Sequence, residues 1–245
     1  MSDSLVIIPT YKEKENIVRI IRAVISLVYP IDILVVDDNS PDGTADLVRE
    51  LMEEIPGRIY LEERKGKLGL GTAYIHGFKW GLEKGYEYIM EMDADFSHNP
   101  IDLIRLRDAC VQGADVAIGS RYVSGVNVVN WPMSRVMMSY FASVYVRYIT
   151  GMHVMDTTAG FKAYKRKVLE TINFEKIKFI GYAFQIEMKF TAWKHGFIVK
   201  EIPIIFTDRS RGESKMSKGI FKEAVIGVLE MKIGSWFRKY EQKTI

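Results

Sequence analysis

Over its first 125 residues the chain alternates short apolar runs with longer segments whose apolar residues recur at helical spacing. One run, Leu34-Val35-Val36, is apolar without alternation, as is typical of a strand buried on both faces. Strands that alternate with helices in this way form a mostly parallel sheet with helices on both faces. The expected strands are Leu5–Pro9, Ile31–Asp37, Ile59–Leu61, Tyr88–Met92 and Val116–Gly119, and the expected helices are Glu15–Val28, Asp42–Glu54, Leu70–Glu83 and Pro100–Gln112.

The second half of the chain has a different pattern. Pro132–Ile149 predicts a helix that carries many methionines and aromatic residues, which suit either a core or a lipid-facing surface. Ile198–Phe206 predicts a strand, and Pro203 indicates an edge position, because proline has no N–H to donate to a neighbouring strand. Arg209–Gly219 is polar and basic and contains glycine, so we expect a mobile loop there. Lys222–Tyr240 predicts a closing amphipathic helix.

Composition is that of a globular protein. The chain has 245 residues, of which 48% are hydrophobic and 27% charged, which suits one large α/β domain over residues 1–245 and excludes a disordered chain. The one cysteine, Cys110, excludes a disulfide framework, and its place in an expected helix favours a buried thiol over a nucleophile. The four histidines are scattered without ligand spacing, which argues against zinc.

Two further features bear on membranes and charge. The N-terminus lacks the pattern of a secretory signal, and no window reaches the roughly 20 apolar residues of a membrane span. The net charge is only +3, but residues 209–245 hold nine Lys or Arg against four Glu. This excess is compatible with an anionic partner, such as phosphate groups or a membrane surface, and with a solvated terminal helix, which charge alone favours.

Polar residues gather where the expected strands end. Pro9–Glu13 follow the first strand, Asp37–Thr44 the second, Asp93–Asp95 the fourth and Ser120–Tyr122 the fifth. In an open parallel sheet, ligands bind beyond the carboxyl ends of the strands, near the point where the strand order reverses. The sequence therefore predicts a ligand site at this edge.

The segment Asp93-Ala94-Asp95 is the strongest chemical signal in the chain. Two carboxylates separated by one residue can converge on a hard divalent cation, and Mg²⁺ prefers a few carboxylates together with phosphate oxygens and water. Mn²⁺ accepts a similar set of oxygen ligands. Because Asp93 directly follows an apolar strand, we interpret the pair as a candidate metal site.

Asp38 has two compatible interpretations. Its carboxylate can accept hydrogen bonds from the ring N–H groups of a nucleobase. Ser40 and Pro41 also look like the N-cap and first residue of a helix, so turn and capping chemistry explains the acidic run as well, with the cap holding the loop that presents Asp38. Neither G-x-G-x-x-G after the first strand nor G-x-x-x-x-G-K-[ST] is present, which disfavours a dinucleotide dehydrogenase and a P-loop NTPase.

Six segments carry a combined pattern: Val6–Asn16, Val35–Thr44, Leu68–Tyr74, Met92–Pro100, Gly119–Tyr122 and Arg211–Lys215. Together they resemble the inverting GT-A-type glycosyltransferases of family 2, and in particular the dolichyl- or polyprenyl-phosphate mannosyltransferases (the catalytic subunits of dolichol-phosphate mannose synthases). The resemblance runs from about residue 4 to residue 218. It implies a Rossmann-like α/β fold, with a nucleotide-sugar half over about 1–125 and an acceptor half over about 126–245.

The resemblance also implies roles for residues of the donor half. Five residues match positions that hold the nucleoside, with Tyr11 against the base. Asp93 and Asp95 match the metal ligands for Mg²⁺ or Mn²⁺, and Ala94 lies with them at the diphosphate. Ser97 stands where some relatives have a glutamine that ligates the metal, which puts a third protein ligand in doubt. The nucleoside positions are Pro9, Tyr11, Glu13, Val36 and Asp38.

Four cations are implied near the acceptor. Arg121 matches an arginine beside the transferred sugar and the acceptor phosphate, and Arg209 and Lys215 match a basic loop that closes over both phosphates. With Asp95 these three form the implied catalytic set. Arg135 suits either acceptor binding or a structural salt bridge. Asp156 matches an acidic turn of these enzymes, and capping explains it equally well. Gln185 and Glu187, at the start of an apolar helix, are weaker candidates for contacts with sugar hydroxyls.

The implied reaction is metal-dependent, inverting transfer of mannose from GDP-mannose to dolichyl or polyprenyl phosphate. We expect a protein without a nucleic-acid partner, peripheral on the cytoplasmic face of a membrane, where a membrane-anchoring subunit is one way to hold it. Two alternatives stay open: the same fold acting with UDP-glucose, another nucleotide-sugar or a saccharide acceptor, and a non-catalytic subunit that binds nucleotide-sugars.

Overall fold

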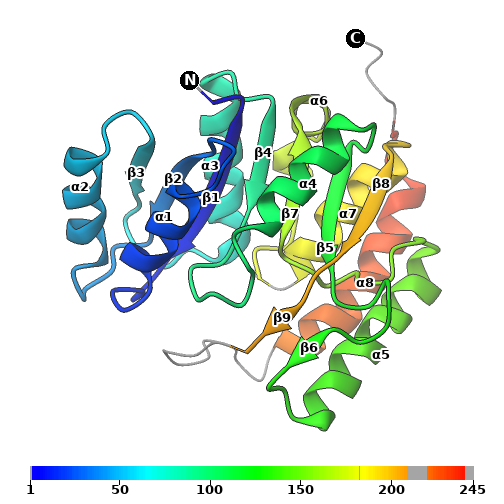
Figure 1. The fold of residues 1–245 in the computed structure, drawn as a ribbon. Helices are drawn as coiled ribbons and strands as arrows, with labels where there is room; N and C mark the ends of the chain where they lie inside the picture. Colours follow the sequence, from blue (N-terminus) through cyan, green and yellow to red (C-terminus); the bar gives the residue numbers. More distant parts are fainter. Residues whose placement is uncertain (1, 182, 209–219, 241–245) are drawn as a thin grey trace.

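A computed structural model describes residues 2–181, 183–208 and 220–240. Within them, seven strands form one sheet in the order β3-β2-β1-β4-β7-β5-β8, and β6 and β9 form a small parallel pair beside it (Figure 1). The strands are β1 (Ser4–Thr10), β2 (Asp32–Asp37), β3 (Ile59–Glu63), β4 (Tyr88–Glu91), β5 (Val116–Ser120), β6 (Val128–Val129), β7 (Lys162–Lys165), β8 (Val199–Pro203) and β9 (Phe206–Thr207).

The topology places an edge for ligands between β1 and β4. Both strands are parallel, and the strand order runs one way from β1 to β3 and the other way through β4. At such a switch point the loops after the two strands diverge and leave a crevice. Within the large sheet, β7 alone runs antiparallel, between β4 and β5.

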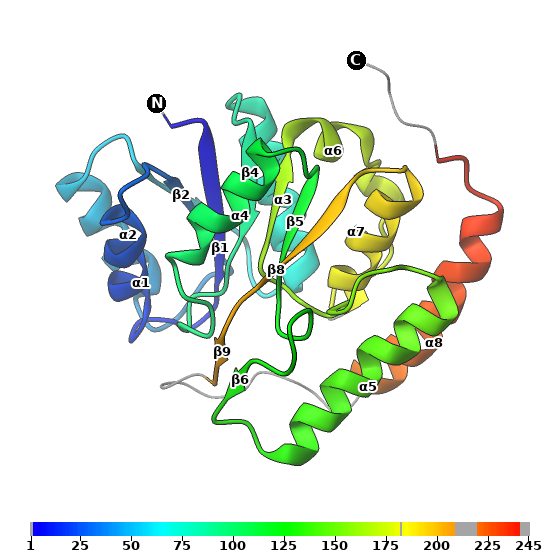
Figure 2. The same ribbon diagram turned by 45° about the vertical axis from the view of Figure 1, so that its right-hand side comes forward.

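Helices cover both faces of the sheet (Figures 1 and 2). One face packs against α1, α2 and α4. The other packs against α3, α6 and α7, with contributions from α5 and α8. The helices are α1 (Ile17–Ile25), α2 (Thr44–Glu54), α3 (Leu70–Glu83), α4 (Asp102–Val111), α5 (Met133–Thr150), α6 (Arg166–Thr171), α7 (Ala183–Lys194) and α8 (Ile220–Trp236), with a 3-10 turn at Phe174–Lys176.

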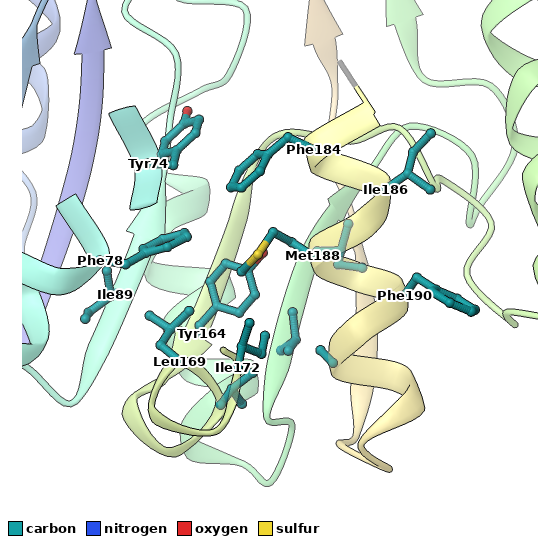
Figure 3. Close-up of a cluster of buried hydrophobic side chains, with 14 of the residues drawn as sticks. Tyr74, Phe78, Ile89, Tyr164, Leu169, Ile172, Phe184, Ile186, Met188 and Phe190 are labelled. Carbon is teal, nitrogen blue, oxygen red and sulfur yellow. The ribbon is translucent and has the colours of Figure 1, made fainter. Parts of the chain in front are cut away.

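Aromatic packing joins the two halves of the chain on the second face. Tyr74 of α3 stacks on Phe184 of α7, with ring centroids 6.2 Å apart, and Phe78 meets Tyr164 of β7 edge-on at 5.6 Å (Figure 3). These four side chains are fully buried. Since α3 belongs to the first half and α7 to the second, one continuous core supports both.

The sequence-based prediction of strands and helices is largely confirmed. All five strands expected in the first half are present, and β8, which ends at Pro203, lies at the sheet edge as predicted. The expected strand Ile198–Phe206 is instead divided into β8 and β9. Strand β7 was not predicted, because its sequence Lys-Ala-Tyr-Lys begins and ends with lysine. The expected loop Arg209–Gly219 lies outside the described residues.

The prediction that Ser40 caps a helix is wrong. Helix α2 begins at Thr44, after Gly43 in a left-handed conformation with φ of +83°. Ser40 instead bonds back to Asp37, donating its backbone N–H and its hydroxyl to the two carboxylate oxygens at 2.8 and 2.6 Å. A side chain that closes the turn in this way leaves the start of the helix to the residues that follow.

Helices α5 and α8 pack against each other at one side of the molecule (Figure 2). The Tyr145 hydroxyl donates to the Val225 carbonyl at 3.0 Å, and Lys232 Nζ donates to the Thr150 carbonyl at 3.1 Å. Met133 and Phe141 of α5 and Ile233 of α8 are at least half exposed. None of the described helices combines the length and apolar character needed to cross a membrane.

Close packing of α3 on β1 yields a stability prediction. A Cβ on Gly77 would lie 2.7 Å from Cγ2 of the fully buried Ile7, whereas a Cβ on Gly234 of α8 would meet nothing within 4 Å. We expect Gly77→Ala to lower the free energy of unfolding by about 1–3 kcal/mol through overpacking. Gly234→Ala should raise it by up to about 1 kcal/mol through helix propensity. Urea unfolding of both variants tests this, and equal effects would contradict the packing argument.

Candidate active site

Hydrogen bonds join the loops after β1 and β2. Asp38 N–H donates to the Thr10 carbonyl at 3.0 Å, and the Thr10 hydroxyl donates to Asp37 Oδ1 at 2.7 Å. Glu13 N–H donates to the Thr44 hydroxyl at 3.1 Å. The predicted nucleoside positions on the two loops are therefore held together as one rigid edge.

The predicted nucleoside residues differ in whether a side chain or only the main chain is accessible to a ligand. Tyr11 is half-buried, with the ammonium groups of Lys12 and Lys67 at 5.7 and 5.3 Å from its ring centroid. Pro9 pairs in register with Val36, whose side chain is fully buried in the core. Val36 can therefore face a ligand only through its main chain.

Asp38 has a partner that the sequence analysis missed. Nε and Nη2 of Arg64, the residue after β3, donate to Asp38 Oδ1 at 2.6 and 2.5 Å. Arg64 Nη1 also donates to the Thr72 hydroxyl at 2.7 Å, which ties the pair to the first turn of α3. Both charged side chains are less than a tenth exposed. Only the second oxygen of Asp38 is left to accept from a ligand.

The candidate metal ligands lie directly beyond β4. Asp93 is 42% exposed, and the Tyr74 hydroxyl donates to its Oδ1 at 3.5 Å. Asp95 is buried and accepts the Ser97 N–H at 3.0 Å. The two neighbouring polar side chains, Ser97 and His98, are also buried. Among the described residues, the Ser97 hydroxyl and His98 Nδ1 have no hydrogen-bond partner, and Asp93 Oδ2 lies 4.0 Å from His98 Nδ1.

Arg121, after β5, is held by Asp156. Arg121 Nε and Nη2 donate to the two Asp156 oxygens at 2.7 and 2.6 Å, and Nη2 also donates to the Thr158 hydroxyl at 2.7 Å. Burial alone would raise the pKa of Asp156, but the charge and hydrogen bonds of Arg121 bring it below its usual value. This ion pair accounts for Asp156, and it holds Arg121 in one orientation.

Arg135, in the first turn of α5, bonds Asp208 after β9. Its Nη1 donates to Asp208 Oδ1 at 3.0 Å, and its guanidinium lies 4.0 Å from the centroid of the Trp131 ring. The structural salt bridge that the sequence analysis left open is thus present. The other two predicted acceptor cations, Arg209 and Lys215, lie outside the described residues.

A buried polar network beneath the site was missed by sequence reasoning. Glu91 of β4 meets Lys162 of β7 at 3.1 Å and accepts from Gln185 of α7 at 2.8 Å. Lys189 of α7 donates to the Ala159 carbonyl at 2.6 Å, and burial lowers the pKa of its ammonium well below the usual range. Glu187 accepts the backbone N–H groups of residues 178 and 179. The idea that Gln185 and Glu187 contact sugar hydroxyls finds no support, because both are buried with internal partners.

Comparison with known proteins identifies the family. The profile of Glycosyl transferase family 2 matches residues 5–172. The chain is 49% identical to a polyprenol monophosphomannose synthase of Mycolicibacterium smegmatis, over 93% of this chain and 86% of the relative. It is 47% identical to an undecaprenyl-phosphate mannosyltransferase of Micrococcus luteus, over 91% of each. The chain belongs to glycosyl transferase family 2.

Solved structures of more distant glycosyltransferases share the fold. A glucosyl-3-phosphoglycerate synthase from Mycobacterium tuberculosis, solved with Mn²⁺ and UDP, superposes with a TM-score of 0.66 at 15% identity, over 94% of this chain and 79% of that one. A mannosyltransferase from Pyrobaculum calidifontis, solved with GDP-Man and Mn²⁺, gives 0.61 at 17% identity, over 98% and 65%. The predicted GT-A fold is confirmed.

The residues present fit a divalent cation of the kind these family 2 enzymes are expected to use. Asp93 and Asp95 offer carboxylate oxygens at the switch point, and the unpartnered Ser97 hydroxyl and His98 Nδ1 lie in the same loop. Within the described ranges, no three His, Cys, Asp or Glu side chains converge as a complete cage. A pair of carboxylates completed by phosphate oxygens and water is the arrangement that Mg²⁺ prefers.

His98 gives a pH-dependent stability prediction for this glycosyltransferase without metal. Burial lowers the pKa of His98 to about 4, so the unfolded chain, with a pKa near 6.5, binds a proton that the folded chain rejects. Stability should fall as the pH drops from about 6.5 toward 4, by about 2 kcal/mol at pH 5. Urea unfolding in EDTA at pH 7 and pH 5 measures this loss. His98→Phe should show a loss smaller by that amount, and equal pH dependence in both proteins would contradict the assignment.

Proposed function

We propose that this chain transfers mannose from GDP-mannose to a polyprenyl or dolichyl phosphate, with a divalent metal and with inversion at the anomeric carbon. The observation that carries the proposal is near-full-length similarity, at 47–49% identity, to two enzymes named for mannosyl transfer to polyprenyl phosphates. The distant structure bound to GDP-Man and Mn²⁺ supports the choice of donor and metal type.

The donor base is assigned to the edge formed by Pro9, Tyr11, Glu13, Val36 and Asp38. Arg64 occupies Oδ1 of Asp38, which leaves Oδ2 to accept a ring N–H of the base. Tyr11, with its ring half-buried at the same edge, is assigned to the face of the base. A base that presents no N–H donor to Asp38 would leave a buried acceptor unsatisfied, which is costly.

The diphosphate and metal are assigned to Asp93, Ala94 and Asp95. The two carboxylates would hold Mg²⁺ or Mn²⁺ at the end of β4, and the Ala94 main chain lies between them. When bound, the cation would supply positive charge to the diphosphate as it leaves. Asp95 is buried and held by the Ser97 N–H, so its carboxylate is already oriented for this role.

The acceptor phosphate is assigned to Arg121, Arg135, Arg209 and Lys215. An oxygen of the lipid phosphate attacks the anomeric carbon, the carbon–oxygen bond to the diphosphate breaks, and its electron pair leaves with the nucleoside diphosphate. Direct displacement inverts the anomeric configuration. A phosphate monoester is ionised near neutral pH, so no strong general base is needed. The cations are needed to bring two anions together.

Peripheral contact with a membrane follows from the nature of the acceptor. The exposed methionine and aromatic side chains of α5 form an apolar surface suited to the lipid interface. Arg135 lies at the start of this helix, where it would meet the phosphate of a lipid whose chain stays in the bilayer. We assign the protein to the cytoplasmic face, with or without an anchoring subunit.

Two alternatives remain distinguishable by experiment. The structure solved with UDP supports a uridine nucleotide as an alternative donor on the same fold. A non-catalytic nucleotide-sugar-binding subunit is disfavoured, because both relatives at 47–49% identity are named as enzymes.

Product identification with a matched variant tests the proposal. The protein is incubated with GDP-mannose, UDP-glucose or other nucleotide-sugars, polyprenyl phosphate, and Mg²⁺ or Mn²⁺, and the lipid product is identified by mass spectrometry. We expect polyprenyl-phosphate mannose to form from GDP-mannose only. Asp95→Asn should lower turnover by at least about 100-fold with little change in stability, because it removes a metal ligand. Asp108→Asn, on the exposed face of α4, is the control. Full activity of Asp95→Asn, or activity in EDTA, would overturn the metal assignment.

The Asp38–Arg64 pair yields a separate prediction on donor affinity. Asp38→Asn should weaken GDP binding by about 1–3 kcal/mol, because an amide replaces the acceptor offered to the base. Arg64→Gln should lower the free energy of unfolding by about 3–5 kcal/mol, since it leaves a buried carboxylate unpaired. Calorimetry measures the first effect and urea unfolding the second, with exposed Asp46→Asn as control. Unchanged GDP affinity in Asp38→Asn would refute the base-reading role.

A further inference from the structure

Arg147, in the last turn of α5, has no counter-charge among the residues that the structure describes. Among the described arginines, Arg147 and the exposed Arg19 are the two that pair with no carboxylate. Arg147 Nε is buried without a hydrogen-bond partner, and Nη1 contacts Met155 Sδ at 2.6 Å. A partly buried guanidinium with an unsatisfied Nε–H and only a weak sulfur acceptor at Nη1 is unfavourable unless an anion reaches it.

Arg147 lines a surface pocket of about 410 Å³. Val144, Tyr148, His153 and Met155 also line it, and no lining residue is acidic. The dipole of α5 stabilises a cation at the C-terminal end of the helix, but this stabilisation is small. It also provides no hydrogen-bond acceptor for Nε. The carbonyl of Thr150, the last residue of α5, accepts a hydrogen bond from Lys232 Nζ.

The pocket lies at one end of an apolar stripe. Met137, Phe141 and Tyr148 follow one another at helical spacing on α5 and are 51%, 58% and 86% exposed. Helix α8 lies beside α5 (Figure 2), and its Ile226 and Ile233 are also exposed. An apolar stripe that ends in an arginine fits the boundary of a bilayer, where acyl chains give way to phosphates.

We propose that the Arg147 pocket binds the phosphate of an anionic membrane phospholipid. The proposal rests on the peripheral membrane contact in the proposed function and names the lipid group that the contact recognises. It differs from the acceptor site, because Arg135 precedes Arg147 by 12 residues, or about 18 Å along the helix. Arg147 therefore anchors one end of α5 while the other end faces the reacting phosphate.

Vesicle co-sedimentation of the full chain tests this proposal. Phosphatidylcholine vesicles are compared with vesicles that also contain 30 mol% phosphatidylglycerol, with wild type, Arg147→Gln and Val144→Glu. We expect the preference for anionic vesicles to fall about fivefold in Arg147→Gln, the contribution of one basic residue at such a surface. Val144→Glu should show the same loss, because it places a carboxylate three residues before Arg147 as an internal counter-ion. Arg22→Gln, at an exposed position of α1, removes the same charge far from the pocket in sequence and is the control for net charge.

Each other outcome has a defined meaning. Wild-type preference in both pocket variants, or an equal loss on neutral and anionic vesicles, would overturn the proposal. Stabilisation of wild type but not Arg147→Gln by inorganic phosphate, with no difference between vesicles, would assign the pocket to a free anion instead. Thermal melting checks that the variants fold. If Arg147→Gln does not fold, Val144→Glu still tests the proposal. Transfer to a short-chain acceptor in detergent should be normal in both variants. Its absence in wild type would count against the proposed function and not against the pocket.

Discussion

The pairing of Glu91 with Lys162 fixes where the functional residues of this glycosyltransferase meet. The two residues are register partners on antiparallel β4 and β7, and both side chains are fully buried. Because the strands are antiparallel, the residues that follow Glu91 lie beside the residues that precede Lys162. Asp93 and Asp95 follow Glu91, and Asp156 and Thr158 precede Lys162. The insertion of β7 thus brings the Asp156-bound Arg121 next to the candidate metal ligands.

Buried ion pairs of this kind hold the loops in place, but burying the charges costs solvation free energy. A buried ion pair is seldom better for stability than apolar residues of the same shape, but removing one partner is strongly destabilising. Glu91–Lys162, Asp38–Arg64 and Arg121–Asp156 all lie at or near strand ends, and each joins segments distant in sequence. Their effect is to hold loops, which carry little apolar surface of their own, in one arrangement. Lys189 shows the same cost, since burial lowers the pKa of its ammonium while its Nζ donates to the Ala159 carbonyl.

The sequence could predict those parts of the fold and site whose pattern lies within one short segment of the chain. Apolar runs with helical or strand spacing are local, so β1 to β5, the flanking helices and the clustering of Asp38 and Asp93 at one edge were predictable. Burial of Cys110 was predictable for the same reason, and burial raises the pKa of its thiol to about 12. Arg64, Lys162 and Lys189 were not, because a lysine or arginine is buried only when a distant residue provides its partner. Strand β7 was missed because its two lysines, the buried Lys162 and the partly buried Lys165, look like exposed residues in sequence. Ser40 was misread because a hydroxyl that can cap a helix can also close a turn on Asp37.

Pairing also divides the basic residues by role. A guanidinium that already bonds a carboxylate shapes a pocket, and an added anion must share or displace that carboxylate. Arg64 and Arg121 are of this kind, each buried against an aspartate. Arg135 is less buried, and its partner Asp208 directly precedes Arg209 in the chain. An anion that bonded Arg135 would therefore compete with Asp208, the residue directly before the basic segment in sequence. Under the proposed function, Arg135 is the described acceptor-side arginine whose ion pair an incoming phosphate would disturb most easily, because the Arg121 pair is more deeply buried.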